Sequence, residues 1–520
     1  MSEENPSGNF SESRRDFLRG LGVTVGGAAI GGGGIGTAFG QGAIPSGYTF
    51  HRVLTMLPPF LHPIIPPPYG ITNITPGVFL GSFNSPGSDP GQSVIFFHGT
   101  LKDGDLPAVF RMVLRFRGHA QPTIETVEGF LSVGGEIRDI EGVPDDQLPL
   151  KVNHIGAGSG NVHGNYATSI IAEDPAGLNP DGSLSLRSLP GIYLFRSDTK
   201  KWESIARCGD PSPDGAQYGG IMGDVVLHDD NSVTLVAATT KSPSGEQKTA
   251  GRGISGFIGS QILAHVDRRG RGDVLLQTGD MLPRTHAMIE SFGLIDAVKG
   301  RNFIAQVNAR RIDVLGSRPG TAVVRGRVKS TGNNRMDGVE LLSASPHLLP
   351  NSMLNDNSLL VGESILGPRI GRAGRAAVVT HDPRFSTGVG ELEKHRLTTI
   401  QPGGERSLIV RAGDSVGPRV VGALSAPVVS SETDLTYEAE VLDDGSSRLL
   451  VSEGNNSRII LRSGDSLDGG IVTDIHHGYH SAQVDVNGRL ALVVELLGDP
   501  NGDPTNSLNI VTALVVGIPA

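Results

Sequence analysis

The stretch "LIVRAGDSVGPR" (residues 408–419) returns 51 residues later as "IILRSGDSLDGG" (459–470), and this repetition decides the fold. In both copies an apolar, strand-like run leads into Gly-Asp and then into a turn rich in Gly or Pro. Three earlier stretches have the same form: "SIARCGDPSPDG" (204–215), "VLLQTGDMLPR" (274–284) and "SLLVGESILGPR" (358–369). A repeated unit of about 50 residues with several strands is typical of one blade of a β-propeller.

Strand-like patterns also fill the chain between these copies. "SVTLVAAT" (232–239), "LTYEAEV" (435–441) and "RLALVVEL" (489–496) are rich in β-branched and apolar residues and are bounded by Gly, Asp, Asn or Pro. No window of twelve residues combines helical spacing of apolar residues with helix caps. The sequence therefore predicts an all-β chain that forms a β-propeller of about six or seven blades. Tandem β-sandwiches or a β-solenoid are the alternative.

The persistent part of the repeat is the pair Gly-Asp or Gly-Glu. A glycine supplies positive φ at no steric cost, and an aspartate in a turn can accept a hydrogen bond from the backbone N–H two residues on. We therefore interpret these pairs as structural turns at the blade ends. In chain order they are Gly209 and Asp210, Gly279 and Asp280, Gly362 and Glu363, Gly413 and Asp414, and Gly464 and Asp465.

Two of these copies also contain letters known from serine hydrolases. Gly413, Ser415 and Gly417 fit the pattern G-x-S-x-G, and "GDSL" ends with Ser466 and Leu467. In the sister copies the serine position holds Pro211, Met281 or Ser364, and a turn and strand follow Ser466 where a nucleophile elbow needs a helix. We interpret the serines as turn residues, with serine hydrolysis as the less favoured alternative.

The N-terminus contains "SRRDFLRG" (13–20), which resembles the twin-arginine export motif through Arg14, Arg15, Phe17 and Leu18. A weakly apolar stretch rich in Gly and Ala follows, with small residues at Ala38 and Gly40 near an expected cleavage point. The resemblance implies export of the folded protein by the twin-arginine translocase to the periplasm or the cell exterior.

Three segments follow from this organisation. Residues 1–43 are predicted to be the signal peptide, 44–71 a Pro-rich lead-in and 72–520 the β-propeller repeat domain. No stretch after the leader has eighteen uninterrupted apolar residues, so we expect the mature protein to be soluble.

Composition excludes several kinds of partner and site. The formal net charge is -10 and the pI is about 5.8, which argues against nucleic-acid binding because phosphate contacts rely on clustered Lys and Arg. Cys208 is the only cysteine, so the chain contains no internal disulfide and no zinc or iron–sulfur site with several cysteines.

Two stretches could hold a metal ion. In "GDPNGDPTNS", Asp499, Asn501 and Asp503 have the one, three, five spacing of calcium loops, but position twelve is Ile510 where a bidentate Glu is expected. The spacing makes calcium a candidate cofactor, and the missing Glu leaves a plain Pro/Gly turn as the other interpretation. In "HHGYH", two of three histidines share a strand face; those at 154 and 163 would complete a site only if the fold gathered them.

Over residues 72–520 the recurring "GD" blade ends resemble those of a poorly characterised group of exported bacterial β-propeller-like proteins. The resemblance implies the fold and carries no activity. We expect a binding or scaffold protein of unknown ligand. The alternative is a hydrolase or lyase that uses Asp, Glu or His at the central channel. An enzyme should gather unlike polar residues from different blades in one pocket, whereas a scaffold should have an open, evenly polar channel.

Overall fold

The computed structural model describes residues 44–520 apart from several internal segments. These segments are 57–70, 74–79, 85–88, 90, 102–105, 146–147, 174–190, 242–259, 299–301, 329–335, 355–358, 365, 372, 382–394, 431–434, 454–455, 477–481 and 498–509. The predicted signal residues Arg14, Arg15, Phe17 and Leu18 lie outside the described residues, as do Asp499, Asn501 and Asp503 of the predicted calcium loop.

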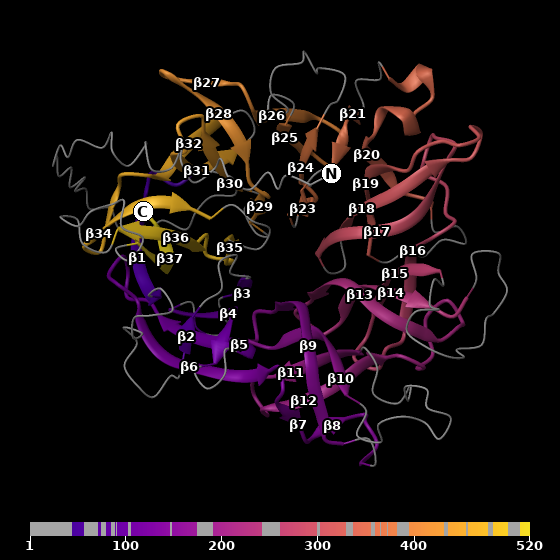
Figure 1. Cartoon of the computed structure of the whole chain (residues 1–520), viewed down its shortest axis with the longest axis horizontal. Helices are drawn as coiled ribbons and strands as arrows, with labels where there is room; N and C mark the ends of the chain where they lie inside the picture. The colour runs from indigo at the N-terminus through magenta and orange to yellow at the C-terminus, as the bar shows by residue number, and fades with distance from the viewer. Residues whose placement is uncertain are drawn as a thin grey trace, which may run out of the picture.

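Seven sheets surround a central axis, each forming one blade of a β-propeller (Figure 1). Blade 1 contains β2 (Ile71–Asn73), β3 (Leu80–Asn84), β4 (Gln92–Leu101), β5 (Leu106–Arg115) and β6 (Thr123–Ser132). Blade 2 contains β7 (Glu136–Ile137), β8 (Ile140–Glu141), β9 (Leu150–Gly160), β10 (Tyr166–Glu173), β11 (Gly191–Arg196) and β12 (Lys201–Arg207). Blade 3 contains β13 (Tyr218–Leu227), β14 (Val233–Thr239), β15 (Gln261–Val266) and β16 (Gly272–Gln277).

The remaining four blades follow in chain order. Blade 4 contains β17 (Ala287–Val298), β18 (Asn302–Arg311), β19 (Gly320–Arg327), β20 (Glu340–Ala344) and β21 (Leu360–Val361). Blade 5 contains β22 (Glu363–Ser364), β23 (Arg369–Ile370), β24 (Ala376–His381), β25 (His395–Ile400) and β26 (Arg406–Arg411). Blade 6 contains β27 (Ser415–Val416), β28 (Arg419–Leu424), β29 (Val428–Val429), β30 (Thr436–Leu442), β31 (Ser447–Glu453) and β32 (Asn456–Arg462).

Blade 7 combines strands from both ends of the described chain. It contains β33 (Ser466–Leu467), β34 (Gly470–Ile475), β35 (Ala482–Val484), β36 (Leu490–Leu497), β37 (Ile510–Pro519) and β1 (Tyr48–Met56). Strands β1 and β37 pair antiparallel, with Tyr48 opposite Pro519 and Met56 opposite Thr512. The propeller is thus closed by main-chain hydrogen bonds between its first and last strands (Figure 1).

The prediction of an all-β propeller is confirmed, and the number of blades is seven. The three patterns picked out in the sequence form β14, β30 and β36. All seven residues of β14 are buried, because each blade packs against a neighbour on both faces. Two 3₁₀ turns, η5 (Pro346–Leu348) and η6 (Asn351–Met353), lie between β20 and β21.

The start of the propeller lies earlier than the sequence predicted. Residues 48–56, assigned to the Pro-rich lead-in, form the outermost strand of blade 7. The physical reason is the pattern "YTFHRVLTM", whose Leu54 is buried in the same apolar cluster as Leu514 and Val516 of β37. Among the described residues, no helix has the length and apolar character needed to cross a membrane.

Candidate functional site

The Gly-Asp pairs lie where the last strand of one blade leads to the first strand of the next. Gly209, Gly279, Gly413 and Gly464 have φ values of 89°, 95°, 91° and 93°. In each of these copies an Asp oxygen accepts the backbone N–H three residues earlier, not the N–H two residues on that the sequence suggested. The pairs are Asp210 and Arg207 (2.9 Å), Asp280 and Gln277 (2.8 Å), Asp414 and Arg411 (2.9 Å), and Asp465 and Arg462 (3.0 Å).

The same pairs join their turn to the next blade through the backbone. Gly464 N–H donates to the Val472 carbonyl at 2.8 Å, and Val472 N–H donates to the Asp465 carbonyl at 2.9 Å. Gly362 differs, because it lacks the positive φ and its N–H donates to the Ala344 carbonyl at 2.9 Å, while Glu363 begins β22.

The two serines of the hydrolase-like motifs are exposed on two-residue strands. Ser415 on β27 lies opposite Val420, and Ser466 on β33 lies opposite Ile471. The chain continues from Ser466 through a turn into β34, so no helix follows this serine. The nearby Asp474 is buried, and its Oδ1 accepts the N–H of Ile475 at 2.9 Å.

The histidines considered as metal ligands do not form a site in the described residues. His476 lies 3.8 Å from Oε1 of Glu495, and exposed side chains at His154 and His163 lie on β9 and in the turn after it. Nowhere in the described ranges do three or more His, Cys, Asp or Glu side chains cluster as metal ligands would. Burial raises the pKa of the Cys208 thiol to about 11, so this thiol is not activated at neutral pH.

A small cavity of about 170 Å³ lies on the propeller axis, and all seven blades contribute to its wall. Its charged and amide side chains come from four different blades. They are Asp224 of β13, Asp296 of β17, Arg369 of β23 and Gln483 of β35. Apolar residues such as Phe83 and Val428 complete the lining.

The carboxylates of this cavity bind backbone groups of the following blade. Asp296 accepts the N–H groups of Ala297 at 2.9 Å and of Ile370, in blade 5, at 3.0 Å. Asp224 accepts the N–H of Ile295, in blade 4, at 3.4 Å. Burial raises the pKa of Asp296 above its ordinary value, and the charge of Arg369 and the two N–H bonds oppose part of that rise. The acids therefore connect consecutive blades.

A larger groove of about 610 Å³ lies between blades 2 and 3. One wall consists of β12 with the end of β8 and the junction turn, and the other of the β13–β14 and β15–β16 turns. Its lining is dominated by carboxylates and guanidiniums: Glu141, Glu203, Asp210, Asp230, Asp267, Arg207, Arg268, Arg269 and Arg271.

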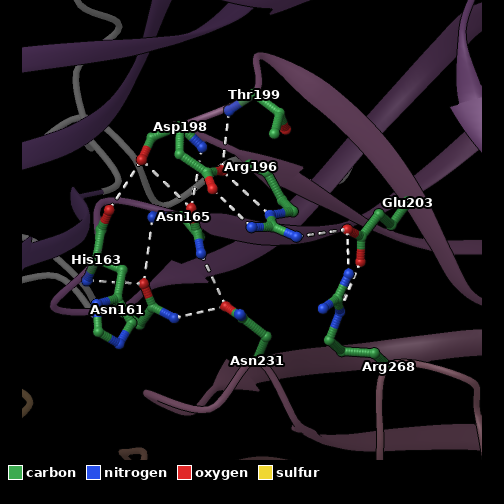
Figure 2. A network of polar contacts seen from close by, with 10 residues as sticks. Asn161, His163, Asn165, Arg196, Asp198, Thr199, Glu203, Asn231 and Arg268 are labelled. Atoms are coloured by element: carbon green, nitrogen blue, oxygen red, sulfur yellow. Dashed lines mark hydrogen bonds and ion pairs between the residues drawn. The ribbon is translucent and has the colours of Figure 1, made fainter.

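The floor of this groove contains a buried carboxylate between two arginines. The Glu203 side chain is 6 % exposed, and Arg196 from its own blade donates to Oε1 at 3.3 Å. Arg268 of blade 3 donates from Nε to Oε2 at 2.8 Å and also contacts Oε1. Figure 2 shows the two guanidiniums approaching Glu203 from different sides. A buried charge held by hydrogen bonds in this way fixes the arginine that reaches across the blade boundary.

Beside this ion cluster, an amide cluster joins the same two blades. Asn231, in the β13–β14 turn, has φ 64° and accepts hydrogen bonds from Nδ2 of Asn161 (2.9 Å) and Asn165 (2.8 Å) (Figure 2). The turn that lines one side of the groove is therefore fixed to blade 2.

Sequence reasoning singled out none of the polar cavity residues and, among the groove residues, only Asp210, as part of a structural turn. Gly223-Asp224 has the same letters as a junction turn but lies inside β13. The groove had one visible signal, the charged run "DRRGRGD" (267–273), which spans the β15–β16 turn. Its partners on β8 and β12 are distant in sequence.

No family model matches the chain, and no curated protein matches it. Among solved structures, the chain is similar to the β-propeller domain of the Trilobed protease from Pyrococcus furiosus, with a TM-score of 0.38 and 9% identity over 81% of this chain and 89% of that one. It is similar to Pyrococcus horikoshii acylaminoacyl peptidase, with a TM-score of 0.36 and 10% identity over 81% of this chain and 49% of that one, about half its length. It is also similar to the BP39L lectin from Burkholderia pseudomallei, with a TM-score of 0.31 and 10% identity over 73% and 83% of the two chains.

Proposed function

We propose that this chain is an exported β-propeller that binds a ligand in the groove between blades 2 and 3. The groove volume of about 610 Å³ supports this, because small-molecule sites usually measure about 300–1,000 Å³. The central cavity, at about 170 Å³, is smaller than that range. The groove is also preorganised, because Glu203 holds Arg268 and Asn231 holds the adjacent turn.

One observation favours the alternative, an enzyme at the central cavity. Unlike polar residues from different blades meet there, and burial raises the pKa of Asp296, as in a general acid. The engagement of both Asp296 oxygens with backbone N–H groups argues for a structural role. We therefore rank a hydrolase or lyase second. Turnover of chromogenic esters or glycosides that disappears in Asp296→Asn, while the variant stays folded, would reverse this order.

The binding proposal is tested by thermal shift with a panel of sugars, sugar acids, amino acids, nucleotides and phosphate. At least one compound should raise the melting temperature of the parent and not of the double variant Arg269→Gln, Arg271→Gln. The matched control is Arg138→Gln, whose side chain is 81% exposed on blade 2 and does not line the groove. Equal shifts in parent and double variant, or no shift with any compound, would contradict a ligand site in the groove.

Export has its own test. Because the paired arginines are the core of the motif, changing Arg14 and Arg15 to Lys should leave the precursor in the cytoplasm. Cell fractionation measures this, with the unchanged leader as control. Normal export of the double variant would remove the twin-arginine route and the periplasmic or extracellular location from the proposal.

A further inference from the structure

We infer that the groove between blades 2 and 3 recognises an anionic polyol, a sugar carrying one carboxylate or phosphate group. This inference rests on the proposed binding function and names its ligand class. Three features of the groove carry it: two presented guanidiniums, carboxylate acceptors on both walls and a lining with a single large apolar residue.

The guanidiniums belong to the β15–β16 turn, whose backbone is fixed. Oδ1 of Asp267 accepts the N–H groups of Arg269 at 2.8 Å and of Arg271 at 3.0 Å. Gly270 has φ +70°, and a Cβ at this position would lie 2.5 Å from the Ile205 carbonyl oxygen, so the turn presses closely on β12. The two side chains therefore extend from a rigid base.

The two arginines are available to a ligand to different degrees. Within the described part of the chain, the Arg269 guanidinium makes no hydrogen bond or ion pair, and its charge acts on the nearby Asp267, whose pKa it helps to lower. Arg271 is 71% exposed and lies 3.5 Å from Asp267, an exposed pair that contributes little energy. Arg268, by contrast, is occupied by Glu203. A planar guanidinium binds carboxylate or phosphate through two parallel hydrogen bonds, which makes Arg269 the anion anchor.

Both walls of the groove present acceptors for hydroxyl donors. Glu141 and Asp210 come from blade 2, and Asp230 comes from the β13–β14 turn, where its Oδ1 accepts from Ser232 Oγ at 2.7 Å. Five carboxylates line the groove against four guanidiniums, so a polyanion would be repelled while one anionic group beside Arg269 is tolerated. Ile205 is the one large apolar residue in the lining, and no aromatic ring is present among the described lining residues. The ligand is therefore polar along its whole length.

Isothermal titration calorimetry with four probes tests the ligand class: glucuronate, glucose 6-phosphate, glucose and inorganic phosphate. We expect the parent to bind glucuronate or glucose 6-phosphate, and the comparison of these two identifies the anionic group. The double variant Arg269→Gln, Arg271→Gln should bind roughly tenfold more weakly or worse, because charge-assisted bidentate bonds are lost. The control Arg138→Gln should bind like the parent.

Other outcomes separate failure of the ligand class from failure of the groove. Glucose bound as tightly as glucuronate would overturn the anionic requirement, and phosphate bound as tightly as glucose 6-phosphate would overturn the polyol requirement. Absence of binding by all four probes, combined with a groove-dependent thermal shift from another compound, would overturn the class and leave the binding function standing. Binding that is unchanged in the double variant would overturn both.

Discussion

The central cavity and the peripheral groove are both rich in charge, but the ring builds them differently. Every blade contributes to the cavity, whereas blades 2 and 3 alone line the groove. In the cavity, Asp224 and Asp296 accept backbone N–H groups of the next blade. In the groove, Glu203 holds a guanidinium in place while Arg269 extends from a fixed turn. A high density of charged residues is therefore a weaker indicator of a binding site than the presence of polar atoms that are not already hydrogen-bonded within the protein.

The largest effect should come from deleting residues 507–520. This removes β37, whose Ala513, Leu514, Val515 and Val516 are fully buried, and leaves β1 and β36 without their shared partner. Burial of a Leu or Val side chain contributes about 1.5–3 kcal/mol, and the three larger side chains together approach the whole stability of a typical domain. We expect an insoluble or protease-sensitive product, measured by limited proteolysis and thermal melting. Removal of β1 should also lower the thermal stability, but by less, because only the β1–β37 ladder is lost. Equal thermal stability of the 507–520 truncation would show that neither the ring nor its central cavity depends on this strand.

Asp296→Ala separates the cavity from the groove. Two N–H groups, those of Ala297 and Ile370, lose their acceptor, which should cost about 1–3 kcal/mol of unfolding free energy. Arg269→Gln in the groove is the matched comparison and should cost less than about 0.5 kcal/mol. Chemical denaturation measures both, and equal losses would end the distinction between the two regions.

The same residue predicts a pH dependence. Because the folded-state pKa of Asp296 lies above 3.8, the folded protein holds this proton more tightly than the unfolded chain. Its contribution to stability is therefore largest below that value and decreases as the pH rises through the folded-state pKa. Denaturation of the parent and of Asp296→Asn across the acidic to neutral range should show a shallower decline for the variant. Parallel curves would contradict the assignment.

Glu438 represents a third situation, a buried acid with one carboxylate oxygen that lacks a hydrogen-bond partner among the described residues and with the charge of Arg448 nearby. It lies on β30 with 2% exposure, and its Oε1 has no hydrogen-bond partner among the described residues. Burial, with the charge of Glu440 nearby, raises its pKa well above the ordinary value. Glu438→Gln should therefore increase the unfolding free energy at neutral pH, by on the order of 1 kcal/mol. Thermal melts at acidic and neutral pH measure it, and a gain confined to acidic pH would contradict the explanation.

The junction turns should give intermediate effects. Asp414→Ala or Asp465→Ala removes the acceptor for the N–H three residues earlier and should cost about 0.5–2 kcal/mol. Both turns are built locally, so the loss should be the same whether or not a ligand occupies the groove. Unchanged melting temperatures would show that the carboxylates are dispensable.

The smallest effects should come from Ser415→Ala and Ser466→Ala. Both side chains are exposed, so each change should stay within about 0.5 kcal/mol. Treatment of the parent with a fluorophosphonate probe supplies the second measurement. Covalent labelling that vanishes in the Ser466 variant alone would restore an esterase and move the functional site away from both regions compared above.

The sequence predicted the elements that are built locally and repeated. The five Gly-Asp or Gly-Glu stretches and the alternating strands such as 232–239 were sufficient for the all-β class and for a blade count of six or seven. The β-prone stretch at 507–520 favours closure of the ring by the two chain ends, but its partner, residues 48–56, was assigned to the lead-in. Tyr48 and Pro519 pair only because the ring brings the two ends of the chain together. The local sequence pattern contains no information on a partner this far away in the chain.

The sites were less predictable because their residues meet only through the tertiary fold. Asp224 has the same Gly-Asp letters as the junction turns, yet it lies inside β13 and faces the cavity. The groove combines Glu141, Glu203 and Arg269 from three separate segments. Burial, which turns Glu203 from an ordinary surface acid into a fixed anchor, also follows from packing of one blade on the next.

The register of Tyr48 against Pro519 also sets an order of events during synthesis. Strand β1 leaves the ribosome early, and its partner is made only after the intervening chain, which takes about 25–95 s at 5–20 residues per second. During that interval β1 is an unpaired edge with alternating apolar side chains, a template for association with other nascent chains. The nascent protein therefore has a defined window in which a chaperone that shields β1 would improve the yield of folded protein, and slower translation of the late blades would lengthen that window.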